Sequence, residues 1–187
     1  LDDEKINYIN QNMDNVVISI DGRKDIHDAV RHDQKGRGSY ARILPLAQRL
    51  VAGRNGKSYF VRGTFTARNK DFSKDVMHLF DQGFSEVSVE PVVGAGRDFH
   101  FIEADVSEIM SEYDKLALLY LERIIEEPQL RFYHFNIDVF KGPCLYKRVT
   151  ACGAGYEYLA VSPEGLLYPC HQFAGQDGFA VGDINNG

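Results

Sequence analysis

"VVISID" (Val16–Asp21) is the stretch of sequence that decides the fold. It is a short β-branched run that stops at an Asp21-Gly22 turn, a pattern typical of a buried strand. In parallel α/β sheets, functional residues gather at the carboxyl ends of the strands. We therefore expect function at the end of this strand, around Asp21.

Two more strand-like runs follow, and helical patterns separate the three. The runs are "SYFVRGTFTA" (Ser58–Ala67) and "EVSVEPVVG" (Glu86–Gly94), the second interrupted by Pro91. The helical stretches are Ser39–Gly53 and Asp71–Phe84. Strands that alternate with helices form βαβ units, whose right-handed crossovers give a parallel sheet with helices on one side or both.

Both helical stretches carry end signals. In the first, Ser39 is a candidate N-cap and Gly53 a candidate C-cap, while Pro45 between them predicts a kink or a late start. The second has apolar residues at the helical spacing of positions 72, 76, 79 and 80, and it ends on Gly83.

Three βαβ units do not close a barrel and leave unpaired sheet edges. The chain also opens on a polar, helix-like stretch, "LDDEKINYINQN", that lacks an initiator Met. We expect it to be an internal part of a longer gene product.

The residue composition and the pattern of predicted elements change in the last third of the sequence. A long amphipathic helix is predicted over Asp105–Glu127, and the aromatic-rich segment at 129–142 is ambiguous between strand and helix. From Pro143 onward Gly, Pro, Cys and short strands replace the alternating units, and 158–170 predicts a hairpin that turns on Pro163-Glu164-Gly165. We place the domain boundary between 142 and 143, giving domains 1–142 and 143–187.

Composition and charge narrow the functional classes. The 187 residues are 44% hydrophobic and 26% charged, as in soluble globular proteins, and no apolar run is long enough to cross a membrane. The net charge of −6 comes from the second half, because residues 1–93 carry 14 Lys+Arg against 13 Asp+Glu and residues 94–187 carry 7 against 14. The chain has no basic face for a phosphate backbone, so we expect neither a nucleic-acid nor a membrane partner.

Two of the three cysteines, Cys152 and Cys170, have the spacing C-x12-G-x4-C, and a hairpin between them brings its ends together. With no secretory signal in the chain, we expect a reducing, cytoplasmic setting in which a disulfide fits poorly. The C-x2-C or C-x4-C knuckles of structural zinc sites are absent. Two buried, inert thiols therefore remain an alternative to half of a metal site.

The longer text "CGAGYEYLAVSPEGLLYPCHQFAG" (Cys152–Gly175) resembles the opening of the SPASM domain, the auxiliary iron–sulfur module of radical S-adenosylmethionine (SAM) peptide-modifying enzymes. It looks most like the maturases of six-cysteine (SCIFF) peptides. The likeness is close over Cys144–Gly182, and 15–94 resembles the wider radical SAM–SPASM group. The resemblance implies an α/β fold, the C-terminal half of a partial (β/α)6 radical SAM barrel followed by the start of a SPASM domain.

The resemblance also implies cluster ligands. Cys152 and Cys170 would ligate an auxiliary [4Fe–4S] cluster, because cysteine thiolates hold such clusters and tune their potential. Cys144, in "KGPCLYKR", either ligates or lines that cluster or is a plain buried thiol. His171 would be a hydrogen-bond partner near the cluster rather than a ligand.

The same resemblance implies a SAM site on the barrel portion. In "SIDG" (19–22), Ser19 and Asp21 would bind the ribose hydroxyls, since a carboxylate accepts both hydrogens of a diol. The alternative is that Asp21 only makes the turn and Ser19 faces a helix. Arg62, charged within an apolar strand and costly to bury unpaired, would bind the SAM carboxylate.

Other positions are implied less directly. Pro91 and Val92 resemble the segment that flanks the adenine, and Glu90 beside them is a candidate substrate-facing carboxylate. His27, Asp28 and Arg31 have helical spacing in "DIHDAVRHDQKGRGSY". They form either a polar network beside the substrate cleft or a helix-surface network without a catalytic role.

The sequence lacks two motifs of the family that it resembles. The C-x3-C-x2-C motif of the SAM-cleaving cluster and the Gly-Gly-Glu type segment are both absent from the 187 residues. We therefore expect the SAM-cleaving cluster to lie outside the sequence, which alone would be inactive.

The function that the resemblance implies is that of an enzyme which forms Cys thioether crosslinks in a ribosomally made, cysteine-rich precursor peptide. Its cofactors would be SAM and [4Fe–4S] clusters, and an electron donor such as ferredoxin or flavodoxin would be a partner. One alternative is a sulfatase-maturase type oxidation of Cys or Ser to formylglycine. Another is a non-catalytic cysteine metal-binding module.

Overall fold

The computed structural model describes residues 1–93, 99–136 and 152–186. The chain divides into two compact units, Leu1–Ile137 and Asp138–Gly187, which are treated separately below. The boundary predicted between 142 and 143 lies outside the described residues and stays a prediction.

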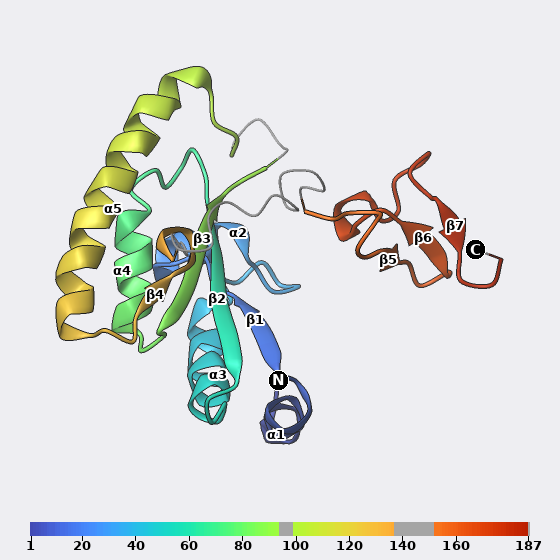
Figure 1. The fold of residues 1–187 in the computed structure, drawn as a ribbon, viewed down its shortest axis with the longest axis horizontal. Coiled ribbons are helices and arrows are strands. Elements are labelled where there is room, and N and C mark those ends of the chain that lie inside the picture. Colours follow the sequence, from blue (N-terminus) through green and yellow to red (C-terminus); the bar gives the residue numbers. More distant parts are fainter. Residues whose placement is uncertain (94–98, 137–151, 187) are drawn as a thin grey trace. The chain divides into compact units, whose positions relative to one another are not determined.

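A parallel four-stranded sheet forms the centre of the first unit (Figure 1). Its strands lie in the order β1 (Asn15–Ser19), β2 (Ser58–Phe65), β3 (Glu86–Pro91) and β4 (Arg131–Phe132), and every neighbouring pair is parallel. The three parallel strands predicted from the sequence are thus confirmed. The ambiguous aromatic segment supplies both the short strand β4 and the 3-10 helix η2 (Tyr133–Phe135).

Helices precede and connect these strands. They are α1 (Asp3–Asn12), α2 (Lys24–Val30), α3 (Tyr40–Ala52), α4 (Ser73–Asp81), the 3-10 turn η1 (Glu103–Asp105) and α5 (Val106–Glu126). Ser39 and Gly53 flank α3 as predicted, but the Ser39 side chain makes no capping bond. The late start suggested by Pro45 is wrong, because α3 runs through that residue.

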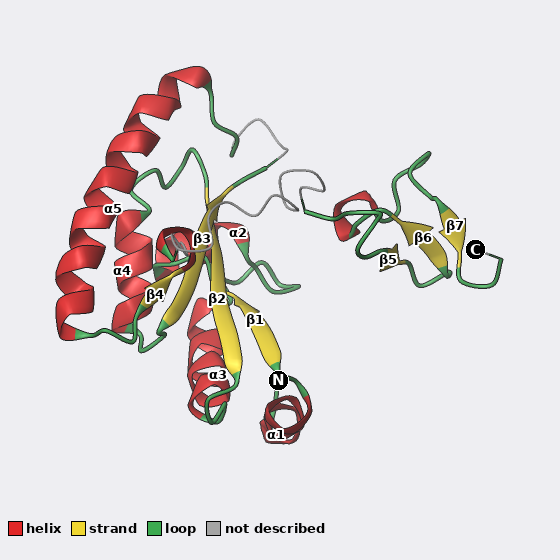
Figure 2. Ribbon diagram, viewed as in Figure 1, coloured by secondary structure: helices red, strands yellow, loops and turns green. Residues whose placement is uncertain are grey.

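The hydrophobic core lies on one face of the sheet. Alternate residues of β2 (Tyr59, Val61 and Phe65) are buried, because successive side chains of a strand point to opposite faces. They belong to one apolar cluster with residues of α3, α4 and α5, and Figure 2 shows α4 and α5 side by side next to the sheet. The opposite face, called the open face below, carries Ser19, Arg62, Thr64, Ser88 and Glu90.

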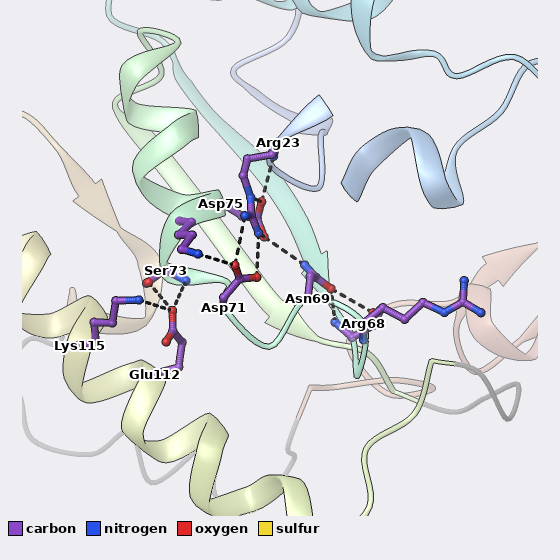
Figure 3. A network of polar contacts seen from close by, with 10 residues as sticks. Arg23, Arg68, Asn69, Asp71, Ser73, Asp75, Glu112 and Lys115 are labelled. Atoms are coloured by element: carbon purple, nitrogen blue, oxygen red, sulfur yellow. Dashed lines mark hydrogen bonds and ion pairs between the residues drawn. The ribbon is translucent and has the colours of Figure 1, made fainter. Parts of the chain in front are cut away.

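A buried polar network fixes the loops at the carboxyl ends of β1 and β2 (Figure 3). The fully buried Asp75, in the first turn of α4, accepts bonds from the Arg23 backbone N–H (3.0 Å), from Arg23 Nε (2.8 Å) and from Asn69 Nδ2 (3.2 Å). Arg23 also makes two bonds to Asp71, at 2.8 and 3.1 Å. The Arg23 guanidinium holds the pKa of Asp71 below its usual value, so this carboxyl stays ionised near neutral pH.

The second unit contains a three-stranded antiparallel sheet. Its strands are β5 (Ala160–Val161), β6 (Leu166–Tyr168) and β7 (Gly182–Asp183), in that order, and the 3-10 helix η3 (His171–Phe173) follows β6. The predicted hairpin is confirmed. Gly165 occupies its turn with a positive φ of 89°, and its N–H donates to the Ser162 carbonyl at 2.9 Å.

Gly22→Ala should destabilise the chain strongly. Gly22 has φ of 131°, and an added Cβ would lie 2.3 Å from Asp75 Cβ. We expect a loss of about 3 kcal/mol of unfolding free energy from strain and overpacking, measured by urea denaturation. The matched control is Gly36→Ala, where φ is also positive (73°) but the added Cβ meets nothing within 4 Å. Equal losses in the two variants would show that Asp75 does not require a glycine at position 22.

Candidate functional site

The open face carries a row of polar side chains toward the carboxyl ends of its strands. In the sheet register Ser19 pairs with Arg62, which pairs with Ser88, and Thr64 pairs with Glu90. Registered residues of parallel strands project to the same face, so the expected ligands Ser19 and Arg62 lie side by side. The alternative interpretation required Ser19 to face a helix, but Ser19 is exposed.

Arg62 is ion-paired with Glu90 through its Nη2 atom. The Arg62 side chain is 52% exposed and that of Glu90 is 31% exposed, while Ser88 Oγ donates to the second Glu90 oxygen at 3.2 Å. Burial alone would raise the pKa of Glu90, but the bond and charge of Arg62 outweigh it and lower the pKa below its usual value. Partial exposure and a carboxylate partner therefore offset the desolvation free energy of placing the Arg62 guanidinium within a strand.

His134 lies near this pair and was not identified from the sequence. It belongs to η2, directly after β4, and its Nδ1 lies 3.4 Å from the Tyr113 hydroxyl. Burial lowers the pKa of His134, and the charge of Glu90 opposes that shift. The side chain is thus a neutral imidazole close to a carboxylate. The only sequence signal for it was its place in the ambiguous aromatic segment.

Asp21 is enclosed rather than open to a ligand. Its side chain is 1% exposed, and both oxygens accept from Arg31, at 2.5 Å from Nε and 3.1 Å from Nη2. One of these oxygens also accepts the Thr64 N–H at 3.1 Å. A ribose hydroxyl reaches this carboxylate only if Arg31 moves, so ribose binding by Asp21 stays a prediction.

His27 holds the backbone of Asp21 from within the fold. Its Nδ1 accepts the Asp21 N–H at 3.3 Å, and its Nε2 lies 3.0 Å from Ser39 Oγ, which donates to the Arg31 carbonyl at 3.0 Å. These partners specify the tautomer with hydrogen on Nε2. His27 is completely buried, so the interpretation of a helix-surface network is wrong for this residue. Asp28 acts separately, accepting the Tyr40 N–H at 2.8 Å.

Pro91 and Val92 lie at the end of β3. Pro91 is exposed, and the Val92 N–H donates to the Phe65 carbonyl at 2.9 Å, which extends the pairing with β2 by one bond. Residues 94–98 that follow are not described. Contact of Pro91 and Val92 with an adenine stays a prediction.

In the second unit, the backbone brings the segments that carry Cys152 and Cys170 together. The Gly155 N–H donates to the Pro169 carbonyl at 2.8 Å and to the Tyr158 carbonyl at 3.1 Å. Partial desolvation raises the pKa of Tyr158, and both thiols add to the shift. Cys170 is buried, and its sulfur accepts the Gln172 N–H at 3.4 Å.

The state of these thiols decides between the alternatives. Neither forms a disulfide, so that alternative is wrong, and Cys152 is exposed, so a pair of buried thiols is wrong as well. Within residues 1–93, 99–136 and 152–186, no group of three or more His, Cys, Asp or Glu side chains is placed to hold a metal. Cys144 lies outside those residues. The described chain thus provides two thiols, which is half of a four-cysteine ligand set.

Comparison with solved structures shows the same fold in radical SAM enzymes. The chain is similar to native anSMEcpe, an anaerobic sulfatase-maturase, with bound AdoMet, at TM-score 0.73 and 16% identity over 98% of this chain and 51% of that one. It is similar to the same protein with AdoMet and the Kp18Cys peptide, at TM-score 0.70, 16% identity and the same coverage. SuiB of Streptococcus suis gives TM-score 0.58 and 13% identity over 97% of this chain and 44% of that one.

These likenesses show the fold, which is a partial radical SAM-type α/β fold. The chain spans about half the length of the solved structures that it matches. Searches against protein-family models and curated proteins found no match. None of the helices in the described residues has both the length and the apolar composition needed to cross a membrane.

The stability of the chain should fall as the pH drops from 7 to 5, in part through His27. Burial lowers the pKa of His27, so the folded state favours the neutral form. The stability that this form contributes is complete above the unfolded pKa of about 6.5 and is lost as the pH falls from there toward the lowered folded pKa.

His27→Gln isolates this contribution, because His78 and His134, whose pKa values burial also lowers, titrate in both proteins. We expect the difference in unfolding free energy between the wild type and His27→Gln to shrink from pH 7 to pH 5 in urea denaturation. A constant difference would mean that His27 does not carry the effect.

Proposed function

We propose that this chain is part of a radical SAM enzyme that forms Cys thioether crosslinks in a ribosomally made, cysteine-rich peptide. The observation that carries the proposal is the row Ser19–Arg62–Ser88, which lies in register on the open face near the carboxyl ends of parallel strands. Ligands of open α/β sheets bind at those ends. The similarity to AdoMet-bound anSMEcpe over nearly the whole chain supports SAM as that ligand.

The residues of the open face suit the carboxylate and the ribose of SAM. Arg62 is half exposed and offers a planar guanidinium to a carboxylate, and the Ser19 hydroxyl lies beside it in the sheet. Pro91 and Val92, at the end of β3, are the proposed adenine contacts. Ser19 and Asp21 are the proposed ribose contacts, and for Asp21 this requires Arg31 to give up at least one of its two bonds.

The second unit is the proposed start of a SPASM domain. Cys152 and Cys170 provide two thiolates for an auxiliary [4Fe–4S] cluster, and Cys144 is a further candidate. Two thiols do not complete such a ligand set, so we assign no step to that cluster. SAM, bound together with a reduced iron–sulfur cluster, supplies the radical chemistry of such enzymes. The proposed role of this chain is to bind and orient SAM and the peptide.

A sulfatase-maturase activity is the second candidate, because solved structures similar to this chain include anSMEcpe with AdoMet and Cys-containing peptides. In that reaction a Cys or Ser of the substrate becomes formylglycine. The resemblance of Cys152–Gly175 to the SCIFF peptide maturases supports the thioether reaction instead. A non-catalytic metal-binding module is disfavoured, since 98% of the chain aligns with an enzyme fold. The proposed partners are the precursor peptide and an electron donor such as ferredoxin or flavodoxin.

Mass spectrometry of the product separates the two reactions. The full-length gene product, reconstituted anaerobically with iron and sulfide, is incubated with SAM, reductant and a cysteine-rich peptide encoded beside its gene. Thioether formation should remove two hydrogens for each crosslink and retain the sulfur, because the new bond joins sulfur to carbon. A new aldehyde, formed with loss of sulfur from Cys or with loss of two hydrogens from Ser, would support formylglycine formation instead. A zinc-loaded protein without iron would contradict both reactions.

Arg62→Ala should weaken SAM binding to the full-length gene product roughly tenfold or more, the value of a charge-assisted bond to a carboxylate. Isothermal titration calorimetry measures the dissociation constant. The control is Arg49→Ala on α3, whose side chain is similarly exposed and ion-paired with Asp3. Unchanged affinity in Arg62→Ala would contradict the assignment of Arg62 to the SAM carboxylate.

A further inference from the structure

The ion pair between Arg62 and Glu90 has a consequence for ligand binding, which rests on the proposed role of Arg62. We propose that Glu90 is a built-in competitor for the Arg62 guanidinium, so that the carboxylate of the incoming ligand displaces Glu90 and releases it toward the substrate. Arg62 thereby exchanges one carboxylate for another. Occupancy of the cofactor site then controls when the Glu90 carboxylate becomes available.

The geometry of β2 and β3 makes Glu90 the natural competitor. Arg62 is in register with Ser88, so Glu90 lies two residues further along β3 on the same face, a diagonal distance that long side chains span. Ser88 Oγ donates to one Glu90 oxygen, and the other oxygen is bonded to Arg62 Nη2. A ligand carboxylate that binds Arg62 in the two-bond, fork-like arrangement through its terminal nitrogens needs this Nη2 atom.

The solvent exposure of the Arg62–Glu90 pair determines how strongly Glu90 competes with a ligand carboxylate for Arg62. Both side chains remain accessible to water, and ion pairs of this kind contribute little, at most about 1 kcal/mol. The pair therefore satisfies both charges when the ligand is absent and opens when a better-placed carboxylate arrives. A pair whose carboxylate is completely buried, such as Asp75 with Arg23, would not exchange in this way, because separating it leaves an uncompensated buried charge.

The release changes the chemistry of Glu90. Burial raises its pKa, and the bond to Arg62 opposes that rise. When Arg62 turns to the ligand, the effect of burial remains, and the freed carboxylate becomes a better hydrogen-bond acceptor on the open face. Ser88 still orients it, and the neutral imidazole of His134 lies close by. Glu90 is then placed to accept a hydrogen bond from an N–H or S–H group of the peptide.

Ligand binding to the full-length gene product tests the exchange. Glu90→Gln removes the competing charge and keeps the shape, so SAM affinity should rise roughly fivefold, the upper value of such a pair. 5′-Methylthioadenosine lacks the amino acid carboxylate, and its affinity should not change. The matched control is Glu86→Gln, on the same strand and face, where the carboxylate pairs with Arg131 at 3.6 Å.

The outcomes separate this inference from the proposed function. Tighter SAM binding in Glu90→Gln, together with unchanged binding of 5′-methylthioadenosine, would support the exchange. If Arg62→Ala weakens SAM binding while Glu90→Gln does not strengthen it, the competition is overturned and the SAM site stands. If neither variant alters SAM affinity, the assignment of Arg62 and the exchange both fail. Equal tightening of both ligands would also overturn the exchange, because the gain would not depend on the carboxylate. Thermal midpoints of Glu90→Gln and Glu86→Gln confirm that both variants fold.

Discussion

The buried carboxylate of Asp75 is the interaction on which the arrangement of the candidate site depends. It binds Arg23, just after β1, and Asn69, in the loop after β2, while its own helix α4 packs on β3. A charge with no exposure requires several partners, and removing any of them leaves the others unsatisfied. The carboxyl ends of neighbouring strands are thereby fixed relative to each other. At this edge the β1–β2 register places Ser19 and Arg62 at the same level of the sheet.

The polar groups around this edge are matched to one another. Asp21 is bound by Arg31 and supported by His27, and Glu90 is bound by Arg62 and Ser88. The Asp21 carboxylate of the first set is 1% exposed, although its partner Arg31 is not buried, whereas the Glu90 carboxylate of the second set is 31% exposed. Because desolvated pairs are costly to separate, the two sets have different capacities for change. The site thus combines a buried carboxylate at β1, which is costly to leave unpaired, with a more easily exchanged pair across β2 and β3.

The sequence predicted well those features that depend on local pattern. Alternation and β-branched residues located the three long strands, and turn residues located the hairpin at Gly165, because these signals act over a few positions. The bonds of Asp75 to Arg23 and of Glu112 to Ser73 join residues 52 and 39 positions apart, and no local pattern encodes them. The sequence placed Asp21 at the end of a strand. It did not reveal that Arg31 would cover the carboxylate, since that depends on the turn of the chain between β1 and α2.

A comparison of Arg54 with Arg62 shows which of the two guanidinium groups can bind an anionic ligand. Arg54 is 2% exposed, and its Nη2 donates to the carbonyls of Met13, Asp14 and Ser58 near the amino ends of β1 and β2. Backbone carbonyls cannot leave without unfolding the segments that carry them, so this guanidinium is fixed as part of the fold. The Arg62 guanidinium instead binds a side-chain carboxylate that can rotate away. An arginine with a replaceable anionic partner, at the carboxyl ends of parallel strands, is suited to recognise an anionic ligand.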